Sequence, residues 1–357
     1  MLAITSGASP IYFNDQVYSA INEFIADFKP SSVVILVDEN TYADCLPLLL
    51  DRLDIAYDPN ILIMPQGEAF KTMETVVSVI QELSNLLTDR KALMINLGGG
   101  VVTDLGGFVA SIYKRGIEYI NIPTTLLAMV DASVGGKTGV DLGMLKNQIG
   151  VINNGALVGV DTDYLATLSE REMRSGFAEV IKHGLISDED YWKQVLDFDP
   201  QTMQGLDDLI QGSVAFKNRV VNEDPTEKGL RKILNYGHTL GHAIETFSLE
   251  TDVMEDLLHG EAIAIGMVME SFISHKMFGF AEDRLYELME LVRQHYVKSS
   301  FSPEAIKAIK TYMMHDKKNL NGQINFVLLE GIGQHKIDQV VDNELIDQAF
   351  EFYMKEL

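Results

Sequence analysis

The chain has 357 residues, 46% of them hydrophobic and 22% charged, a composition that excludes an intrinsically disordered protein. Its formal net charge of −24 argues against a nucleic-acid-binding protein, because such binding depends on Lys and Arg neutralising phosphates. No apolar run approaches the roughly 18 residues of a membrane span, the N-terminus lacks a secretory pattern, and Cys45 is the only cysteine. We therefore expect a cytoplasmic protein without disulfides.

The first half of the chain alternates short apolar runs with helical patterns. Ser32–Asp38, Ala92–Leu97 and Tyr119–Pro123 are typical of buried parallel strands. Met73–Leu87, between the first two, has apolar residues at helical spacing. This alternation predicts a parallel sheet that binds its ligands beyond the carboxyl ends of the strands.

A glycine-rich segment, Asn96–Phe108, begins at the end of a predicted strand and continues into a helix. Its three glycines at 98 to 100 expose backbone N–H groups at a helix N-terminus, which indicates either a diphosphate site or simply a tight turn. The usual dinucleotide fingerprint requires glycine where Thr103 stands. Gly135–Thr138 fails as a P-loop in the same way, because Asp131 replaces the first glycine.

The second half is mainly helical in pattern. Ser169 followed by Glu172 is a capping-box signature for a new helix. Met203–Val221 and Ala281–Tyr296 have the apolar spacing of helices, and Gln323–Leu329 is the one late strand.

Three histidines in this half indicate a metal site. His238 and His242 are four residues apart and share one helical face, and His259 lies in a Gly-flanked turn further along. Glu179, among apolar residues, could complete a zinc site, because a buried carboxylate needs a metal or a cation. The alternatives are a structural histidine pair and a simple Glu179–Lys182 helix pair, and spacing alone does not separate them.

The predicted fold class is therefore an α/β N-terminal nucleotide-binding domain with a parallel sheet, followed by a mostly α-helical C-terminal metal-binding domain. We place the first domain at residues 1–165 and the second at residues 166–357.

Nine segments, in order, resemble the 3-dehydroquinate synthase family within the sugar-phosphate cyclases. They run from the triple glycine to the histidines and beyond. The segments are Gly98–Asp104, Pro123–Leu127, Asp131–Gly139, Leu145–Asn147, Gly176–Lys182, Gly229–Arg231, Asn235–His242, His259–Ala262 and His315–Lys318. Two departures are Asp141–Met144, where the family has an Asn-His-Pro type loop, and a longer stretch between the second and third histidines.

The resemblance implies a ligand set that differs from the one suggested by spacing. Zinc or cobalt would be bound by Glu179, His238 and His259, and His242 would be a catalytic partner near the substrate phosphate. NAD would be the second cofactor. Its implied binding residues are Asp38, Asn40, Glu68, Lys71, Gly99, Gly100, Val101, Asp104, Thr124, Thr125, Lys137 and Lys146.

The resemblance also implies a phosphorylated sugar acid as substrate. Its contacts, several of them cationic, would be Asp131, Lys137, Lys146, Asn147, Lys182, Lys217, Arg231, Asn235 and Lys317. Arg115 would reach the phosphate bound by a neighbouring subunit, which implies a homodimer. Neither nucleic acid nor a membrane is expected as a partner.

The implied activity is that of a lyase converting 3-deoxy-arabino-heptulosonate 7-phosphate to 3-dehydroquinate and phosphate in the shikimate pathway of aromatic amino acid biosynthesis. NAD is used catalytically, and the metal is a Lewis acid. One alternative is a sister sugar-phosphate cyclase, although Arg231, Asn235 and Lys217 favour a substrate with a carboxylate. The other is a metal-dependent polyol dehydrogenase of the glycerol dehydrogenase type, which has no need of a phosphate-binding cluster.

Overall fold

The structure is a computed structural model that describes residues 4–6, 9–143, 145–200, 202–314 and 324–357. The chain divides into two compact units. The first comprises Met1–Met173 and Lys217–Asn222, and the second comprises Arg174–Phe216 and Glu223–Leu357. Among the described residues, no helix is long and apolar enough to cross a membrane.

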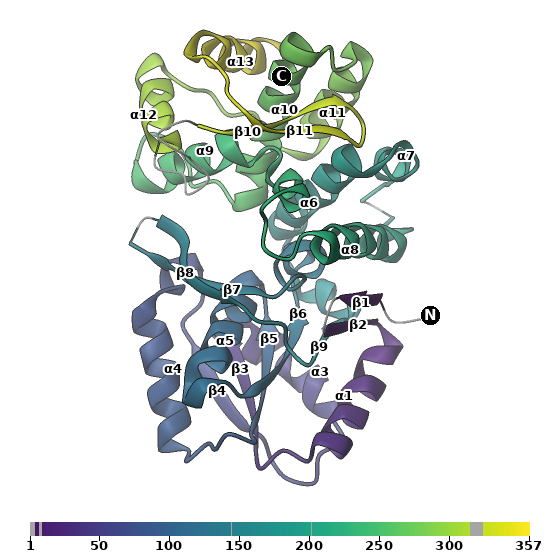
Figure 1. Ribbon diagram of the computed structural model, residues 1–357, viewed down its shortest axis with the longest axis vertical. Helices are drawn as coiled ribbons and strands as arrows, with labels where there is room; N and C mark the ends of the chain where they lie inside the picture. The colour runs from purple at the N-terminus through teal and green to yellow at the C-terminus, as the bar shows by residue number, and fades with distance from the viewer. Residues whose placement is uncertain (1–3, 7–8, 144, 201, 315–323) are drawn as a thin grey trace. The chain divides into compact units, whose positions relative to one another are not determined.

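A seven-stranded sheet forms the centre of the first unit, in the order β1-β2-β9-β6-β5-β3-β4 (Figure 1). Neighbouring strands are parallel, except that β1 and β2 pair antiparallel at one edge. The strands are β1 (Ile4–Ser6), β2 (Ser9–Phe13), β3 (Val33–Asp38), β4 (Asn60–Met64), β5 (Leu93–Gly98), β6 (Glu118–Pro123) and β9 (Leu157–Val160). The three strands predicted from apolar runs are confirmed as β3, β5 and β6, which lie next to one another.

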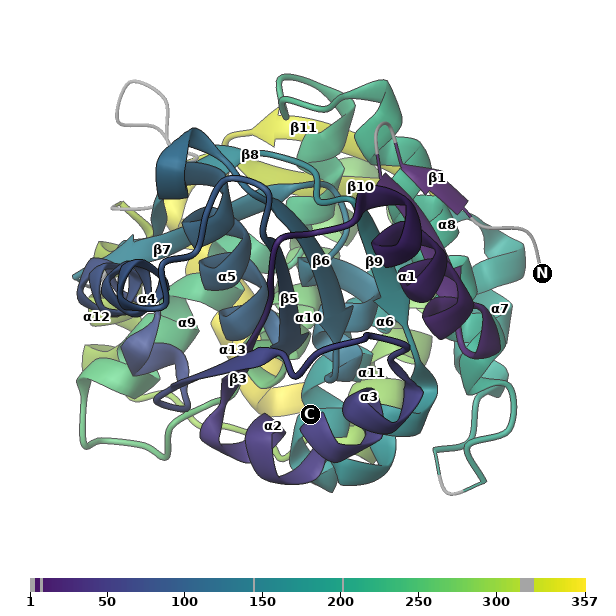
Figure 2. The same ribbon diagram turned by 90° about the horizontal axis from the view of Figure 1, so that it is seen from below.

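Helices fill the connections between these strands. They are α1 (Asp15–Phe28), α2 (Glu39–Asp44), α3 (Leu46–Arg52), η1 (Glu68–Phe70), α4 (Met73–Asn85), α5 (Gly100–Ile112), η2 (Tyr113–Arg115), η3 (Ala128–Ala132) and η4 (Thr162–Thr167). Residues of α4 and α5 share one buried apolar cluster with Val34, Leu36 and Met94 of the sheet. Figure 2 shows α1 beside β9, where the two elements are in contact.

Helix α5 lies unusually close to its neighbours because two consecutive glycines face them. A Cβ on Gly106 would lie 2.1 Å from Oδ1 of Asn96 in β5, and one on Gly107 would lie 2.5 Å from Cγ2 of Thr138. Asn96 in turn donates a hydrogen bond of 2.8 Å to Asn121 of β6. The glycine-rich segment therefore serves tight packing as well as exposing its N-terminal backbone.

An antiparallel hairpin in the first unit was not predicted. It consists of β7 (Lys137–Leu142) and β8 (Leu145–Ile152), in which Gly139 is paired with Gly150. Most of β8 is exposed and its apolar residues do not alternate strictly, so it lacks the period-two pattern by which strands are found.

From residue 170 onward the chain is mostly helical, as predicted. The elements are α6 (Glu170–Ser187), α7 (Glu189–Asp197), α8 (Leu206–Glu223), η5 (Leu230–Asn235), α9 (His238–Glu250), α10 (His259–Phe278), α11 (Glu282–His295), α12 (Pro303–Met313), β10 (Phe326–Gly331), β11 (Gln334–Gln339) and α13 (Asn343–Glu356). The predicted cap of α6 is confirmed, since the Glu172 N–H donates to the Ser169 hydroxyl at 3.2 Å. The late strand is β10, and its partner β11 was missed.

Helix α10 is the centre of the second unit. It contacts α9, α11, α13 and β10 (Figure 1). It has no polar face over most of its length, because Gly260 and the run Ala262–Ser274 are all buried. A helix that is apolar all round belongs inside a core, so its few polar residues lie in the interior as well.

Candidate active site

The glycine-rich segment lies at the carboxyl edge of the parallel sheet. Gly99 and Gly100 follow β5, and Thr124 follows β6, where its N–H donates to the Gly98 carbonyl at 3.0 Å. A Cβ on Gly99 would lie 3.0 Å from Cγ2 of Thr125. A side chain larger than hydrogen at 99 would therefore crowd the turn and cover the N-terminus of α5. These residues fit the diphosphate of a dinucleotide.

A buried ion pair stands beside this edge. Lys71, only 5% exposed, donates to Asp104 at 2.7 Å and to the Asn147 side chain at 2.9 Å. Burial alone would lower the pKa of Lys71, but the negative charges of Asp104 and Glu68 outweigh it, and the pKa is raised. Lys146 lies 3.6 Å from Glu68. Five of the residues that the resemblance assigns to NAD or substrate therefore lie together in the first unit.

Other members of the implied NAD set have separate local roles. Asp38 ends β3 and caps α2, accepting the Thr41 N–H at 2.8 Å. Asn40 is exposed on α2, and Val101 is half-buried in the first turn of α5.

Lys217 belongs to the first unit although it is distant in sequence. It donates to the Asp131 carboxylate at 2.7 Å and also to the Asp131 backbone carbonyl. Lys217 is 5% exposed, whereas the Asp131 side chain is half-buried. Two of the predicted substrate residues are thus brought into direct contact.

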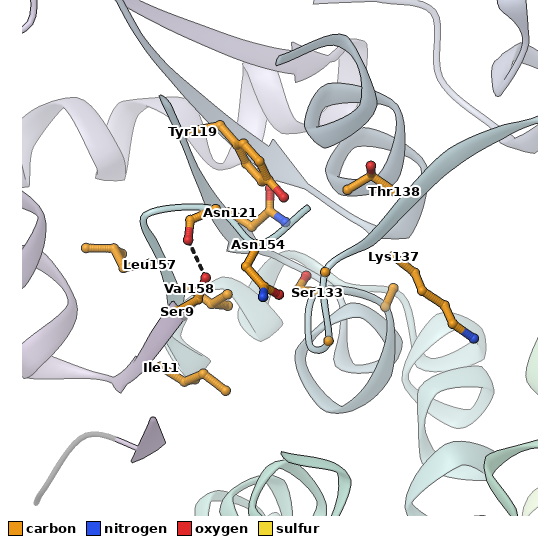
Figure 3. A pocket seen from close by; sticks show the side chains of 14 residues that line it. Ser9, Ile11, Tyr119, Asn121, Ser133, Lys137, Thr138, Asn154, Leu157 and Val158 are labelled. Atoms are coloured by element: carbon orange, nitrogen blue, oxygen red, sulfur yellow. Dashed lines mark hydrogen bonds between the residues drawn. The ribbon is translucent and has the colours of Figure 1, made fainter. Parts of the chain in front are cut away.

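Lys137 is exposed at the start of β7, next to the positive-φ glycines 135 and 136. Beneath this turn lies a cavity of about 10 Å³ lined by Ser133, Asn121 and Asn154, among others. Figure 3 shows the Lys137 side chain extending away from those asparagines. A cavity of that size accommodates about one water molecule, so it is not a substrate site.

In the second unit, Glu179 of α6 is completely buried and faces two histidines. Its Oε1 lies 3.5 Å from Nε2 of His238 and 3.5 Å from Nε2 of His259. Lys182, one turn further along α6 and 1% exposed, forms an ion pair with the other oxygen. The Glu179–Lys182 pair expected as an alternative is therefore present, but it is buried and accompanied by both histidines.

This donor set fits a divalent metal. Two atoms each about 2.1 Å from a tetrahedral zinc are about 3.4 Å from each other. The carboxylate-to-imidazole distances of 3.5 Å agree with that value. A fully buried carboxylate facing two imidazoles is also the chemistry that zinc or cobalt prefers.

The other ring nitrogen of each histidine has a partner that orients the ring. Nδ1 of His238 lies 2.9 Å from the Tyr236 carbonyl, and Nδ1 of His259 lies 3.1 Å from the Glu245 carboxylate. Such contacts direct Nε2 toward a metal. Burial lowers the pKa of His259, but the carboxylates of Glu245 and Glu179 outweigh that effect and raise the pKa to about 9. No local sequence pattern indicated this role for Glu245.

His242 belongs to the same cluster. Its ring lies 5.0 Å from that of His238 and 5.6 Å from that of His259, centroid to centroid. The three histidines each offer a nitrogen within 4.8 Å of the others. The geometry thus accommodates both ligand sets considered for the metal, the one suggested by spacing and the one implied by the resemblance.

Close helix contacts build this cluster. A Cβ on Gly260 would lie 1.8 Å from the Ser175 carbonyl oxygen, and the Gly260 N–H donates to the Ser175 hydroxyl at 3.0 Å. A Cβ on Gly241 would lie 2.6 Å from Cδ1 of Ile263. Glycine at these positions lets α10 approach both α6 and α9, the helices that bear Glu179 and His238.

The remaining predicted residues occupy different places. Arg231 is buried and donates to the Pro225 carbonyl at 2.9 Å, whereas Asn235 donates to Glu227 at 2.7 Å. Arg115 is exposed, with a positive φ of 70°. Lys317 lies outside the described residues.

The first unit has a glycine-lined sheet edge that fits a diphosphate, and the second unit has a buried histidine–carboxylate cluster that fits a divalent metal. Comparison with known proteins identifies the family. Residues 61–175 match the 3-dehydroquinate synthase N-terminal family model, and residues 176–319 match the 3-dehydroquinate synthase C-terminal model. A 3-dehydroquinate synthase of Parabacteroides distasonis is 42% identical over 337 residues, covering 94% of this chain and 95% of the relative. The chain therefore belongs to the 3-dehydroquinate synthase family.

Solved structures of related cyclases share the fold over nearly the whole chain. A 2-deoxy-scyllo-inosose synthase, complexed with carbaglucose-6-phosphate, NAD+ and Co2+, is 25% identical with a TM-score of 0.85, and 98% of each chain is covered. ValA, the 2-epi-5-epi-valiolone synthase of Streptomyces hygroscopicus subsp. jinggangensis with NAD+ and Zn2+ bound, is 26% identical with a TM-score of 0.83. The match covers 100% of this chain and 99% of the ValA chain. The predicted fold class is confirmed.

Proposed function

We propose that this chain is a lyase that converts 3-deoxy-arabino-heptulosonate 7-phosphate into 3-dehydroquinate and phosphate, with NAD and a divalent metal as cofactors. Its membership of the 3-dehydroquinate synthase family supports the reaction. The observation that carries the proposal is the buried Glu179 carboxylate, 3.5 Å from both His238 and His259. When bound, the cofactors supply Lewis acidity and a reversible hydride acceptor.

The proposed metal ligands are Glu179, His238 and His259. Glu245 and the Tyr236 carbonyl orient the two imidazoles through their Nδ1 atoms. His242, adjacent to both rings, is left to transfer a proton at the substrate, because an imidazole can accept or donate near neutral pH. The carboxylate of Glu179 is held in place by Lys182.

The proposed NAD site is the carboxyl edge of the sheet. The backbone at Gly99 and Gly100 receives the diphosphate at the N-terminus of α5. Lys71 forms an ion pair with Asp104 and donates a hydrogen bond to Asn147, so the lysine and the aspartate neutralise each other. The rest of the proposed set is Asp38, Asn40, Glu68, Val101, Thr124, Thr125, Lys137 and Lys146.

The proposed substrate residues explain how a strongly acidic protein binds an anionic substrate. Lys137, Lys217 and their neighbours supply cations in the first unit, and Lys182 and Arg231 supply them in the second. Local clusters of cations outweigh the net charge of the whole chain at a site. A homodimer in which Arg115 reaches the neighbouring subunit's substrate, and a cytoplasmic location, complete the proposal; the exposure of Arg115 and the single cysteine support them.

The direct test is phosphate release from 3-deoxy-arabino-heptulosonate 7-phosphate, followed together with NADH absorbance. We expect stoichiometric phosphate and 3-dehydroquinate, no net NADH, and loss of activity after chelation that added zinc or cobalt restores. Net NADH formation would contradict the proposal and indicate a dehydrogenase. Release only from a phosphorylated sugar without a carboxylate would indicate a sister cyclase.

Arg231→Ala tests the carboxylate-binding role of that residue. Because the guanidinium is buried, its loss is expected to weaken substrate binding by about 2–5 kcal/mol. The measurement is KM for the substrate, with inhibition by inorganic phosphate as the control. A rise in KM with unchanged phosphate inhibition is expected. Equal weakening of both would assign Arg231 to the phosphate instead.

A further inference from the structure

Glu270 of α10 is a fully buried carboxylate that the proposed chemistry does not use. Its Oε2 accepts the Gly237 N–H at 2.8 Å. Its Oε1 accepts the N–H groups of Thr239 and Leu240, each at 3.1 Å. These three donors belong to the first turn of α9 and flank His238 on both sides.

The start of α9 depends on this contact because it has no cap of its own. Its N-cap residue is Gly237, which has no side chain to accept the free N–H groups of the first turn. Gly237 also has a φ of 77°, and a Cβ there would lie 2.5 Å from Cγ of Met267. The cap is therefore supplied by a neighbouring helix, with a full negative charge at the positive end of α9.

The same turn of α10 holds the residue before the cap. The Tyr236 hydroxyl forms a hydrogen bond with Ser271, and the Tyr236 carbonyl lies 2.9 Å from Nδ1 of His238. Residues 236 to 240 are thus fixed by side chains of Glu270 and Ser271. His238 is the middle residue of this segment, and its Nε2 faces Glu179.

We propose that Glu270 is a positioning residue for His238, holding the first turn of α9 so that Nε2 stays directed at a metal shared with Glu179 and His259. The inference rests on the proposed metal role of His238. Glu270 would thus raise the affinity for the metal by orienting His238, without being a ligand of the metal, the substrate or NAD itself.

Glu270→Gln is the test, because glutamine keeps the shape but removes the charge and turns an amide N–H₂ toward backbone donors. We expect affinity for zinc and cobalt to fall about 10- to 100-fold, the usual effect of changing a group that orients a ligand. Affinity is measured on the full chain by competition with a chromophoric chelator. The visible spectrum of the cobalt-loaded protein reports ligand geometry independently of activity and is expected to shift.

Tyr191→Phe is the matched control, since it removes a buried hydroxyl that donates to the Leu209 carbonyl at 2.7 Å in the same unit. It is expected to lower thermal stability while leaving metal affinity and the cobalt spectrum unchanged. Glu270→Asp, which retracts the carboxylate by one methylene but keeps its charge, decides the matter if the glutamine variant does not fold, and an intermediate loss of affinity is expected.

Folded Glu270 variants with wild-type affinity and spectrum would overturn the inference while leaving the metal site intact. A wild-type protein that binds neither zinc nor cobalt would overturn the metal assignment itself, and this inference with it.

Discussion

Glu179→Gln is expected to abolish metal binding and reduce turnover by about 10³-fold. The side chain is fully buried with both histidines 3.5 Å from one oxygen, so the amide keeps the shape but loses the charge that a dication needs. Lewis-acid stabilisation of several kcal/mol corresponds to about three powers of ten in rate. Metal content of the purified protein and phosphate release measure the two effects.

Glu287→Gln is the control for that variant. Glu287 lies in the same unit, where it accepts a hydrogen bond from the Trp192 indole at 3.1 Å and forms an ion pair with Arg284. The isosteric change there is expected to leave metal content and turnover unchanged. Full metal occupancy in Glu179→Gln would remove Glu179 from the ligand set and favour the three histidines.

Gly260→Ala is expected to destabilise the second unit and disrupt the metal site together. The new methyl group would lie 1.8 Å from the Ser175 carbonyl oxygen, a backbone atom that cannot turn aside. Overpacking of this kind costs about 3 kcal/mol, and relief requires α10 to move away from α6. That movement would separate His259 from Glu179. Thermal unfolding and metal affinity are the two measurements.

Gly279→Ala, at the other end of α10, separates the loss of the contact from the general cost of replacing a glycine. Gly279 has a φ of 74°, and nothing lies within 4 Å of a Cβ there. The expected cost is about 1 kcal/mol from the left-handed backbone alone, with unchanged metal affinity. Metal affinity retained by Gly260→Ala would show that the approach of α10 to α6 does not set the distance between His259 and Glu179.

The sequence predicted the elements whose environment is uniform. Strands β3, β5 and β6 are covered on both faces, so each reads as a mainly apolar run, interrupted by Asn96 in β5 and Asn121 in β6. The exposed hairpin β7–β8 has neither such a run nor a strict alternation, and it was missed. The apolar pattern of a segment reflects how its side chains are buried, and none of the β8 residues is fully buried.

The candidate site was predictable only in part. Spacing along one helix could pair His238 with His242, and the apolar neighbours of Glu179 made it a candidate ligand. Its approach to the histidines depends on how α6, α9 and α10 pack, so the alternative of a simple Glu179–Lys182 pair stayed open until the resemblance to a family favoured the metal. Glu245 and Glu270 had no signal at all. A glutamate in a helical pattern is ordinarily a surface residue, and nothing local shows that its partner is the start of another helix or a histidine ring.

Helix α8 has a consequence for how the first unit is completed. Lys217–Asn222, in the C-terminal part of α8, belongs to the first unit, whereas the residues on either side belong to the second. Lys217, the buried partner of Asp131, is therefore synthesised after Arg174–Phe216 of the second unit. Domains generally fold in order of synthesis, but here the α/β unit is not finished at residue 173. The first unit therefore cannot be separated simply by truncation, because a fragment ending at residue 173 would lack the lysine that neutralises Asp131.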